Sequence, residues 1–410
     1  MAEYVIVGNG VAAAGCIEGI RSLDSEGRIT VVSAERHEVY CRPLISYYLE
    51  GKTDLKHIGY RDRDFYERMG CRVLYGVRAV GIDDKKRVVR MDDGTELPYT
   101  ALCVATGSSP FVPPFEGLDK VEKKFGFMTL DDALELEEAI DGNSRVLIVG
   151  AGLIGLKCAE GIVHRVGSVT VCDLADRVLS SILDSECAAM IQSHLEKHGI
   201  TFHLKDSVSR FESRKAVLRS GRSVDFDVLV LAVGVRANTA IVRDIGGAVN
   251  RGIIVDETMR TSLDGIYAAG DCTEALDISS GQKKVMAILP NAYMQGYAAG
   301  IAMAGGSEVY DKAIPMNSIG FFGLHTMTAG TYEGELYEEK TETSVKRLYI
   351  KDNCLKGFML VNCGERAGIY TSMIRERIPL SSVNFEILKK VATTAAFSSE
   401  TRRSKFGGAV

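Results

Sequence analysis

The sequence predicts an α/β fold in which two strand–turn–helix–strand units recur along the chain and a smaller α+β unit follows them. Strand-like runs of Val and Ile lead directly into glycine-rich turns at residues 4–13 and again at 145–155, and a helical stretch follows each turn. The chain has 410 residues and 42 glycines, enough length for two or three packed domains and many tight turns.

Composition excludes several classes of protein. The formal net charge of −5 leaves no basic field for a nucleic-acid backbone, so nucleic acid is not an expected partner. No run approaches the roughly 20 apolar residues that span a bilayer, and the opening MAEYVIVGNG lacks a secretion signal, which predicts a cytoplasmic protein without a membrane span. The ten cysteines are dispersed without C-x-x-C spacing, so we expect reduced thiols and no bound metal.

The first glycine-rich turn follows the strand YVIV (4–7). Gly8 permits the tight turn, Gly10 lets the backbone approach a pyrophosphate, and the small Ala13 lets the helix pack close to the strand. Glu35 lies near the end of the next strand, where its carboxylate can accept hydrogen bonds from a ribose. The predicted dinucleotide contacts of this unit are Gly8, Gly10, Val11, Ala12, Ala13 and Glu35.

The second unit repeats this pattern after the strand RVLIV (145–149). Its turn is a complete G-x-G-x-x-G, and the following strand SVTVCD ends in Asp173 at the ribose position. A carboxylate there pairs with a free 2′-hydroxyl and repels a 2′-phosphate, which predicts NADH rather than NADPH, although Arg177 could soften that preference. The predicted contacts are Gly150, Gly152, Leu153, Ile154, Gly155 and Asp173.

Three further segments lie between and after these two units: ALCVATGSSP (101–110), DVLVLAVGVRAN (227–238) and TSLDGIYAAGDC (261–272). With the two turns, they resemble the pyridine nucleotide–disulfide oxidoreductase superfamily over roughly residues 3–310. The resemblance implies a bound FAD in the first unit and NAD(H) as substrate in the second. It also implies FAD contacts at Val80, Ala105, Thr106, Gly107, Gly270 and Asp271, and nicotinamide contacts at Val233 and Gly234.

The same resemblance predicts the domain organisation. Two Rossmann-like domains are expected, with the NAD-binding domain inserted in the FAD-binding domain, and an α+β C-terminal interface domain of the kind that often forms homodimers. The polar end of the chain is expected to be a mobile tail. The predicted boundaries are 1–114 and 241–310 for the FAD domain, 115–240 for the NAD domain, 311–397 for the interface domain and 398–410 for the tail.

The segment HEVYCRPLISYYLEGK (37–52) decides the redox chemistry. It has one cysteine and lacks the C-x-x-x-x-C pair of the disulfide reductases, so an internal dithiol is not expected. Cys41 would be a redox thiolate only if Arg42 or a helix end lowered its pKa. The favoured interpretation is an ordinary small side chain, in a pattern that resembles rubredoxin reductases, ferredoxin reductases of oxygenase systems and the N-terminal part of nitrite reductase large subunits. There, Arg42 and Pro43 would enclose FAD.

Other residues remain open candidates. Related reductases often have a Lys and a Glu where this chain has Tyr47 and Lys157, so Lys157 either meets the reduced flavin or pairs with Glu160 or solvent. The helical stretch 289–305 resembles the family's helix that approaches the flavin ring, with Asn291 as the stronger contact and Gln295 as the weaker. In the C-terminal domain, Phe321 or Phe322 could close the flavin site or belong to the core; Phe322 is the predicted contact.

The leading functional prediction is an FAD-dependent oxidoreductase that exchanges electrons between NAD(H) and a one-electron partner. A rubredoxin, a ferredoxin-like protein or an iron–sulfur subunit would be that partner. The first alternative is an NADH oxidase or peroxidase that acts on O2 or H2O2, with Cys41 as a possible redox group. The second alternative is a structural or interaction subunit that FAD stabilises. The sequence leaves the direction of electron flow open.

Overall fold

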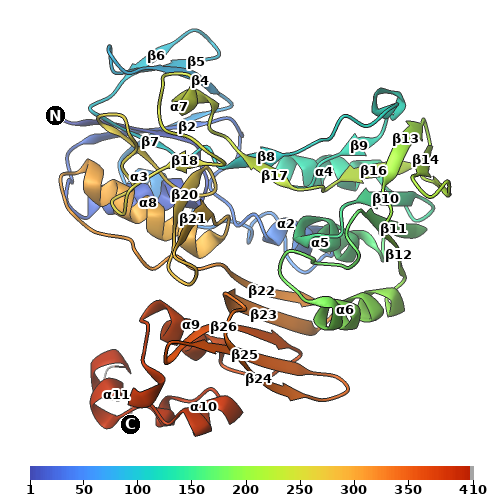
Figure 1. Ribbon diagram of the computed structural model, residues 1–410. Coiled ribbons are helices and arrows are strands. Elements are labelled where there is room, and N and C mark those ends of the chain that lie inside the picture. The colour runs from blue at the N-terminus through green and yellow to red at the C-terminus, as the bar shows by residue number, and fades with distance from the viewer. Residues whose placement is uncertain (407–410) are drawn as a thin grey trace. The chain divides into compact units, whose positions relative to one another are not determined.

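The computed structural model describes residues 1–406 and divides the chain into two compact units (Figure 1). The first unit comprises residues 1–275 and 284–310, and the second comprises 276–283 and the chain from 311 onward. The two dinucleotide-binding halves therefore form one unit. The boundary between the predicted FAD and NAD domains within that unit stays a prediction.

Two five-stranded parallel sheets form the centre of the first unit. In spatial order, the first sheet consists of β19 (Ile266–Ala268), β7 (Ala101–Val104), β1 (Glu3–Val7), β2 (Arg28–Ser33) and β3 (Cys71–Tyr75). The second consists of β12 (Ile200–Leu204), β11 (Ser168–Asp173), β10 (Arg145–Val149), β16 (Val228–Leu231) and β9 (Lys124–Phe125). All strands of the second sheet lie between β7 and β19 in the sequence. The predicted Rossmann-like α/β fold is confirmed.

Helices and smaller sheets complete the first unit. Its helices are α1 (Val11–Arg21), α2 (Leu44–Leu49), α3 (Phe65–Arg68), α4 (Leu130–Ala139), α5 (Leu153–Ile162), α6 (Ser185–Lys197), α7 (Ala240–Arg243) and α8 (Leu289–Met303). Three three-stranded sheets comprise β4 (Ala79–Asp83), β5 (Val88–Met91) and β6 (Glu96–Pro98); β13 (Val208–Glu212), β14 (Lys215–Leu218) and β15 (Ser223–Asp225); and β18 (Ile253–Ile254), β20 (Thr273–Asp277) and β21 (Gln282–Val285). A two-stranded ribbon, β8 (Ser108–Pro110) with β17 (Val235–Ala237), runs between the two large sheets in Figure 1.

Helices α1 and α8 pack with their backbones in contact. A Cβ atom at Gly15 of α1 would lie 2.3 Å from the carbonyl oxygen of Tyr293, and one at Gly296 of α8 would lie 2.0 Å from that of Ala12. Gly19 and Gly300 face the opposite helix in the same way. These four glycines set the close approach of α1 and α8 along their length, because no larger residue fits between the backbones.

The second unit is an antiparallel sheet covered by helices. The strands, in spatial order, are β22 (Met316–Phe321), β23 (Leu324–Gly330), β26 (Cys354–Val361), β25 (Val345–Lys351) and β24 (Glu335–Lys340). Helix α9 (Ala367–Arg375) packs on β26, and Tyr370 and Met373 of α9 are buried with Leu348 and Phe358 of the sheet. Helix α10 (Phe385–Lys390) follows α9 in the chain.

The predicted tail begins with a helix. Residues Ser399–Phe406 form helix α11, and the mobility of the tail stays a prediction. The hydroxyl of Ser398 accepts a hydrogen bond from the backbone N–H of Thr401, and Glu400 lies in the first turn, where a carboxylate stabilises the helix dipole. This capping signal was present in SSET but was masked by the polar composition. Residues 407–410 of the predicted tail lie outside the described residues.

Candidate dinucleotide-binding sites

The turn after β1 forms a cradle at the start of α1. Gly8 has a φ of 110°, and a Cβ atom there would lie 2.1 Å from the carbonyl oxygen of Ala105, so only glycine fits. Gly10 is the N-cap residue of α1, and because glycine has no side chain, the first N–H groups of α1 receive no side-chain cap. A Cβ at Gly10 would meet nothing within 4 Å, so the space in front of the helix end is open.

The turn after β10 forms an equivalent cradle at the start of α5. Gly150 has a φ of 119°, and its Cβ would lie 2.2 Å from the carbonyl oxygen of Ala232. Gly152 caps α5 without a side-chain bond and also faces open space. Gly155 lies against Gly150, because a Cβ there would be 2.0 Å from the Gly150 oxygen.

Both cradles fit the pyrophosphate of a dinucleotide. Uncapped N–H groups and the positive end of the helix dipole attract an anion, and a small residue beside each leaves room for it. Helix α1 begins directly after Gly10 and helix α5 directly after Gly152. Val11, Ala12 and Ala13 are buried in α1, whereas Leu153 and Ile154 are partly exposed in α5.

The turns that close the two cradles also match. Ala105 lies against Gly8 and Ala232 against Gly150, and each alanine donates its N–H to the end of the neighbouring strand at 2.8 Å. Gly107 and Gly234 follow with φ values of 63° and 117°, and a Cβ at either would meet nothing within 4 Å. The structure thus brings Thr106 and Gly107 to the first cradle, and Val233 and Gly234 to the second.

The two predicted ribose acids are held differently. One oxygen of Glu35 accepts from Arg42 at 2.5 Å and the other from the Tyr40 hydroxyl at 2.7 Å. Asp173 instead accepts backbone N–H groups from Ala151 at 2.6 Å and Ala175 at 2.7 Å. A carboxylate has about four acceptor sites, so each acid retains capacity for a ribose hydroxyl.

Arg42 and Tyr40 also reach the segment that opens α4. Arg42 donates to the carbonyl of Met128 at 2.9 Å, and the Tyr40 hydroxyl accepts the N–H of Leu130 at 2.9 Å. Burial raises the pKa of Tyr40 above its ordinary range, so its hydroxyl stays protonated. The loop that carries Glu35 is therefore bound to the start of α4. Pro43 follows Arg42 as the N-cap residue of α2.

The Gly270–Asp271 turn lies beside the α1–α8 pair. Gly270 has a φ of 84°, and its N–H donates to the side-chain oxygen of Gln295 at 2.8 Å. Gln295 is thus engaged in holding this turn, while Asn291 accepts the Tyr310 hydroxyl at 2.8 Å. Burial raises the pKa of Asp271, and the charge of Arg42 acts in the opposite direction.

The two candidate redox residues differ in their surroundings. Burial raises the pKa of the Cys41 thiol, which disfavours the reactive thiolate. Lys157 pairs with the buried carboxylate of Glu160, and its ammonium lies 4.6 Å from the ring centroid of Tyr47 on α2. Of the interpretations left open for Lys157, the structure shows the pair with Glu160.

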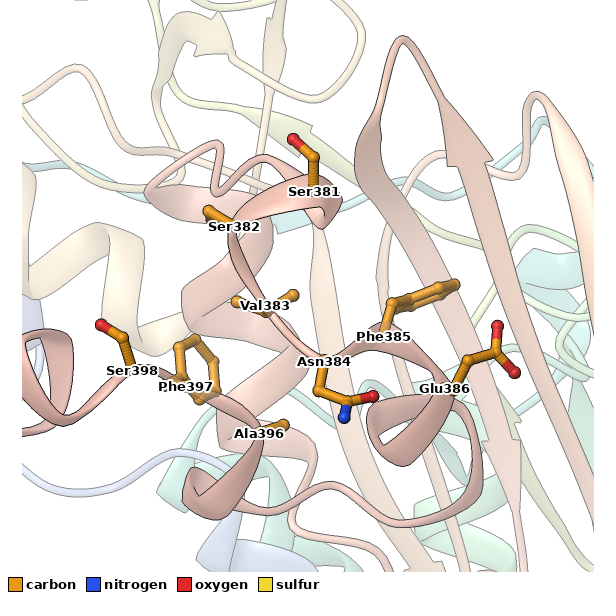
Figure 2. Close-up of a pocket in the computed structure, with 9 residues that line it drawn as sticks. All are labelled: Ser381, Ser382, Val383, Asn384, Phe385, Glu386, Ala396, Phe397 and Ser398. Atoms are coloured by element: carbon orange, nitrogen blue, oxygen red, sulfur yellow. The ribbon is translucent and has the colours of Figure 1, made fainter.

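Val80 and Phe322 are the two remaining predicted contacts. Val80 lies in β4 with 55% of its surface exposed, and Phe322, with a φ of 46°, lies in the second unit, between β22 and β23. A shallow hollow in that unit contains none of the predicted residues (Figure 2). Its lining consists of Ser381, Ser382, Val383, Asn384, Phe385, Glu386, Ala396, Phe397 and Ser398.

Sequence reasoning missed several residues that support the cradles: Tyr40, Asn238 and the four glycines of α1 and α8. The glycines could have been found from the four-residue spacing in VAAAGCIEGIR and in QGYAAGIA, where small residues repeat on one helix face. Tyr40 and Asn238 lie in the segments 37–52 and 227–238 that the resemblance singled out, but their roles could not be predicted because their partners are distant in the chain. Within residues 1–406, no helix has the length and apolarity of a membrane span, and no cluster of His, Cys, Asp and Glu could hold a metal ion.

Comparisons with known proteins identify the family of the chain. A family model, pyridine nucleotide-disulphide oxidoreductase, matches residues 2–296. The epsilon subunit of an NADH-dependent phenylglyoxylate dehydrogenase from Aromatoleum evansii is 33% identical over 92% of this chain and 93% of its own length. A nitric oxide reductase FlRd-NAD(+) reductase from Salmonella agona is 32% identical over 66% of this chain and 72% of its own length.

Solved structures show the same fold. A putidaredoxin reductase in covalent complex with putidaredoxin has a TM-score of 0.88 at 24% identity, over 96% of this chain and 99% of that chain. A ferredoxin reductase from Rhodopseudomonas palustris has a TM-score of 0.81 at 25% identity, over 88% and 91%. The predicted resemblance and the predicted class, an NAD(H)-dependent flavin oxidoreductase, are confirmed. The chain belongs to the pyridine nucleotide-disulphide oxidoreductase family.

Proposed function

We propose that this chain holds FAD in the cradle of α1, accepts electrons from NADH bound in the cradle of α5, and passes them singly to a redox protein or an iron–sulfur subunit. The observation that carries the proposal is the pair of matched cradles in one compact unit, each with an open helix end and an acid at the ribose position. Bound FAD would supply the conversion of a two-electron donor into a one-electron donor.

In this proposal, the residues of the chain bind and orient the two dinucleotides. The N–H groups of α1 and α5 hold the two pyrophosphates, and Glu35 and Asp173 accept ribose hydroxyls. Asp271 lies in a buried turn that Gln295 holds by a hydrogen bond from the N–H of Gly270, and its carboxylate accepts a hydrogen bond from a hydroxyl of the FAD sugar chain. No side-chain nucleophile is assigned. Val80, Asn291 and Phe322 remain proposed FAD contacts.

The acceptor is proposed from the relatives. By their names, the relatives and solved structures given above act with flavorubredoxin, putidaredoxin or a ferredoxin, or are a subunit of a dehydrogenase. A benzene dioxygenase ferredoxin reductase subunit from Pseudomonas putida is also 29% identical over 82% of this chain. A small iron–sulfur protein or subunit is thus the proposed partner. A cytoplasmic location and a homodimer through the second unit are part of the same proposal.

A second candidate is an NADH oxidase. An NADH oxidase from Methanocaldococcus jannaschii is 30% identical over 95% of this chain and 91% of its own length. The raised pKa of Cys41 disfavours the version of this candidate that uses a thiolate.

An acceptor panel separates the two candidates. The FAD-loaded protein would be reduced with limiting NADH without oxygen, and the rate of flavin reoxidation would be measured with rubredoxin, with ferredoxin and with O2. The proposal predicts that one iron–sulfur protein reoxidises the flavin faster than O2 does. Faster reoxidation by O2 than by either protein would favour the oxidase.

A further inference from the structure

One short segment, residues 232–238, touches both cradles. At its start, the carbonyl of Ala232 lies against Gly150, and the carbonyl of Gly234 accepts the N–H of Phe111 at 2.9 Å. Strand β17 then pairs with β8 in antiparallel register, Ala237 opposite Ser108. At most about 20 Å of extended chain separates Ala232 from residue 238.

The segment ends at Asn238, which binds the turn that closes the first cradle through three of its polar groups and strand β8 through the fourth. Its backbone N–H donates to the carbonyl of Gly107 at 2.9 Å, and its side-chain amide donates to that of Thr106 at 2.9 Å. Its own carbonyl accepts the Thr106 hydroxyl at 2.7 Å, and its side-chain oxygen accepts the Ser109 hydroxyl at 2.8 Å. Asn238 therefore binds the carbonyl groups of Thr106 and Gly107 and the hydroxyl of Thr106.

The ribbon between the two cradles is also stiffened from the side. The guanidinium of Arg236 on β17 lies 4.0 Å from the ring centroid of Phe111, which follows β8. The turn at Gly234 is connected to Thr106 through β17, whose residues pair with β8, and through Asn238.

We propose that Asn238 is a positioning residue that sets the approach of the nicotinamide to the flavin ring. This inference rests on the proposed function, since it requires NADH and FAD in the two cradles. Hydride transfer requires reacting atoms about 3–3.5 Å apart, and a misplacement of about 1 Å can lower the rate 100-fold. A residue that couples the closing turns acts on that distance without touching the reacting atoms.

The test compares two variants of Asn238 with a matched control. Asn238→Ala removes both side-chain bonds, and Asn238→Asp keeps the size and the acceptor but places an anionic oxygen against the Thr106 carbonyl. Ser109→Ala removes only the bond at the exposed edge of the ribbon. FAD content, the flavin spectrum and the rate of flavin reduction at rising NADH concentrations would be measured for each. Long-wavelength charge-transfer absorption would be measured after adding NAD+ to photoreduced protein.

We expect both Asn238 variants to retain FAD and NADH affinity while the limiting rate of flavin reduction falls at least about tenfold. The charge-transfer absorption should weaken, because it reports stacking of the two rings. Ser109→Ala should behave as the wild type. Reduction of both Asn238 variants at the wild-type rate would overturn the inference, and so would loss of FAD from both, which would indicate a structural role alone. Failure of NADH to reduce the wild-type flavin would instead refute the proposed function.

Discussion

In both halves of the first unit, a glycine with a positive φ lies against the carbonyl of an alanine in the closing turn, yet the acid beside each cradle is held in a different way. Asp173 is fixed by two backbone N–H groups of its own half. Glu35 is fixed by Arg42 and Tyr40, which also bind the segment that opens α4. Glu35 is therefore tied to the neighbouring half, whereas Asp173 is held within its own half.

This difference agrees with a resident FAD and an exchangeable NADH. A cofactor that stays bound tolerates a site built from long-range contacts, whereas a substrate that leaves in every turnover requires a site that persists when empty. The last small residue of the glycine-rich turn also differs between the halves. The first half accommodates Ala13 in α1, whereas the position of Gly155 in the second half has no room for a methyl group.

The largest expected effect comes from Gly155→Ala. The new Cβ would lie 2.0 Å from the Gly150 carbonyl oxygen, so the second cradle must deform. We expect the free energy of unfolding to fall by about 1–3 kcal/mol and NADH reduction of the flavin to be lost while FAD remains bound. Thermal unfolding and an NADH titration check this. The matched change Ala13→Gly should cost only about 0.5–1 kcal/mol; equal effects of the two changes would refute the asymmetry.

A second large effect is expected at the α1–α8 contact. In Gly296→Ala the methyl group would lie 2.0 Å from the Ala12 carbonyl oxygen and would push α1 away from α8. We expect lower FAD content in the purified protein, measured by flavin absorbance against protein concentration. Gly368→Ala is the control, because Gly368 lies in α9 and a Cβ there would meet nothing within 4 Å; this change should add up to about 1 kcal/mol of stability. Full FAD occupancy in Gly296→Ala would contradict the account.

A moderate effect is expected at the acid of the second cradle. Asp173→Ala removes a carboxylate that a ribose 2′-hydroxyl would use, and hydrogen bonds to charged groups contribute about 1.5–3 kcal/mol. The KM for NADH should rise roughly 10- to 100-fold, with a smaller change for NADPH, whose 2′-phosphate the carboxylate repels. Asp176→Ala, which removes the ion-pair partner of Arg177 and leaves Asp173 in place, should leave the KM for NADH unchanged. Steady-state kinetics with both nucleotides decide the matter.

The smallest expected effect concerns acid stability at the start of the second sheet. The side chain of Arg145, together with its backbone N–H, lowers the pKa of Asp227 to about 2. Because the folded-state pKa is depressed, this stabilisation is present above about pH 4 and is lost as the pH falls toward 2. We expect Asp227→Asn to lower stability at pH 7 by less than about 1 kcal/mol, with the difference vanishing near pH 2. Denaturant unfolding across this range would show a constant difference if the pair were irrelevant.

The sequence predicted the parts of the site that are local in the chain. Each cradle is encoded within about ten residues, because the strand, the glycines and the helix start follow one another; Glu35 comes shortly after the next strand of the first half, and Asp173 ends that of the second. The contacts that join the two halves could not be predicted in this way. Asn238 meets Thr106 across 132 residues and Tyr40 meets Leu130 across 90, and neither pairing leaves a periodic signal.

The most direct test of the account is an anaerobic titration of the purified, FAD-containing protein with NADH, followed at the flavin absorption band. The account predicts that about one equivalent of NADH bleaches the flavin, since one hydride carries both electrons that FAD accepts. A flavin that stays oxidised in excess NADH would contradict the account and would leave a protein in which FAD has only a structural role.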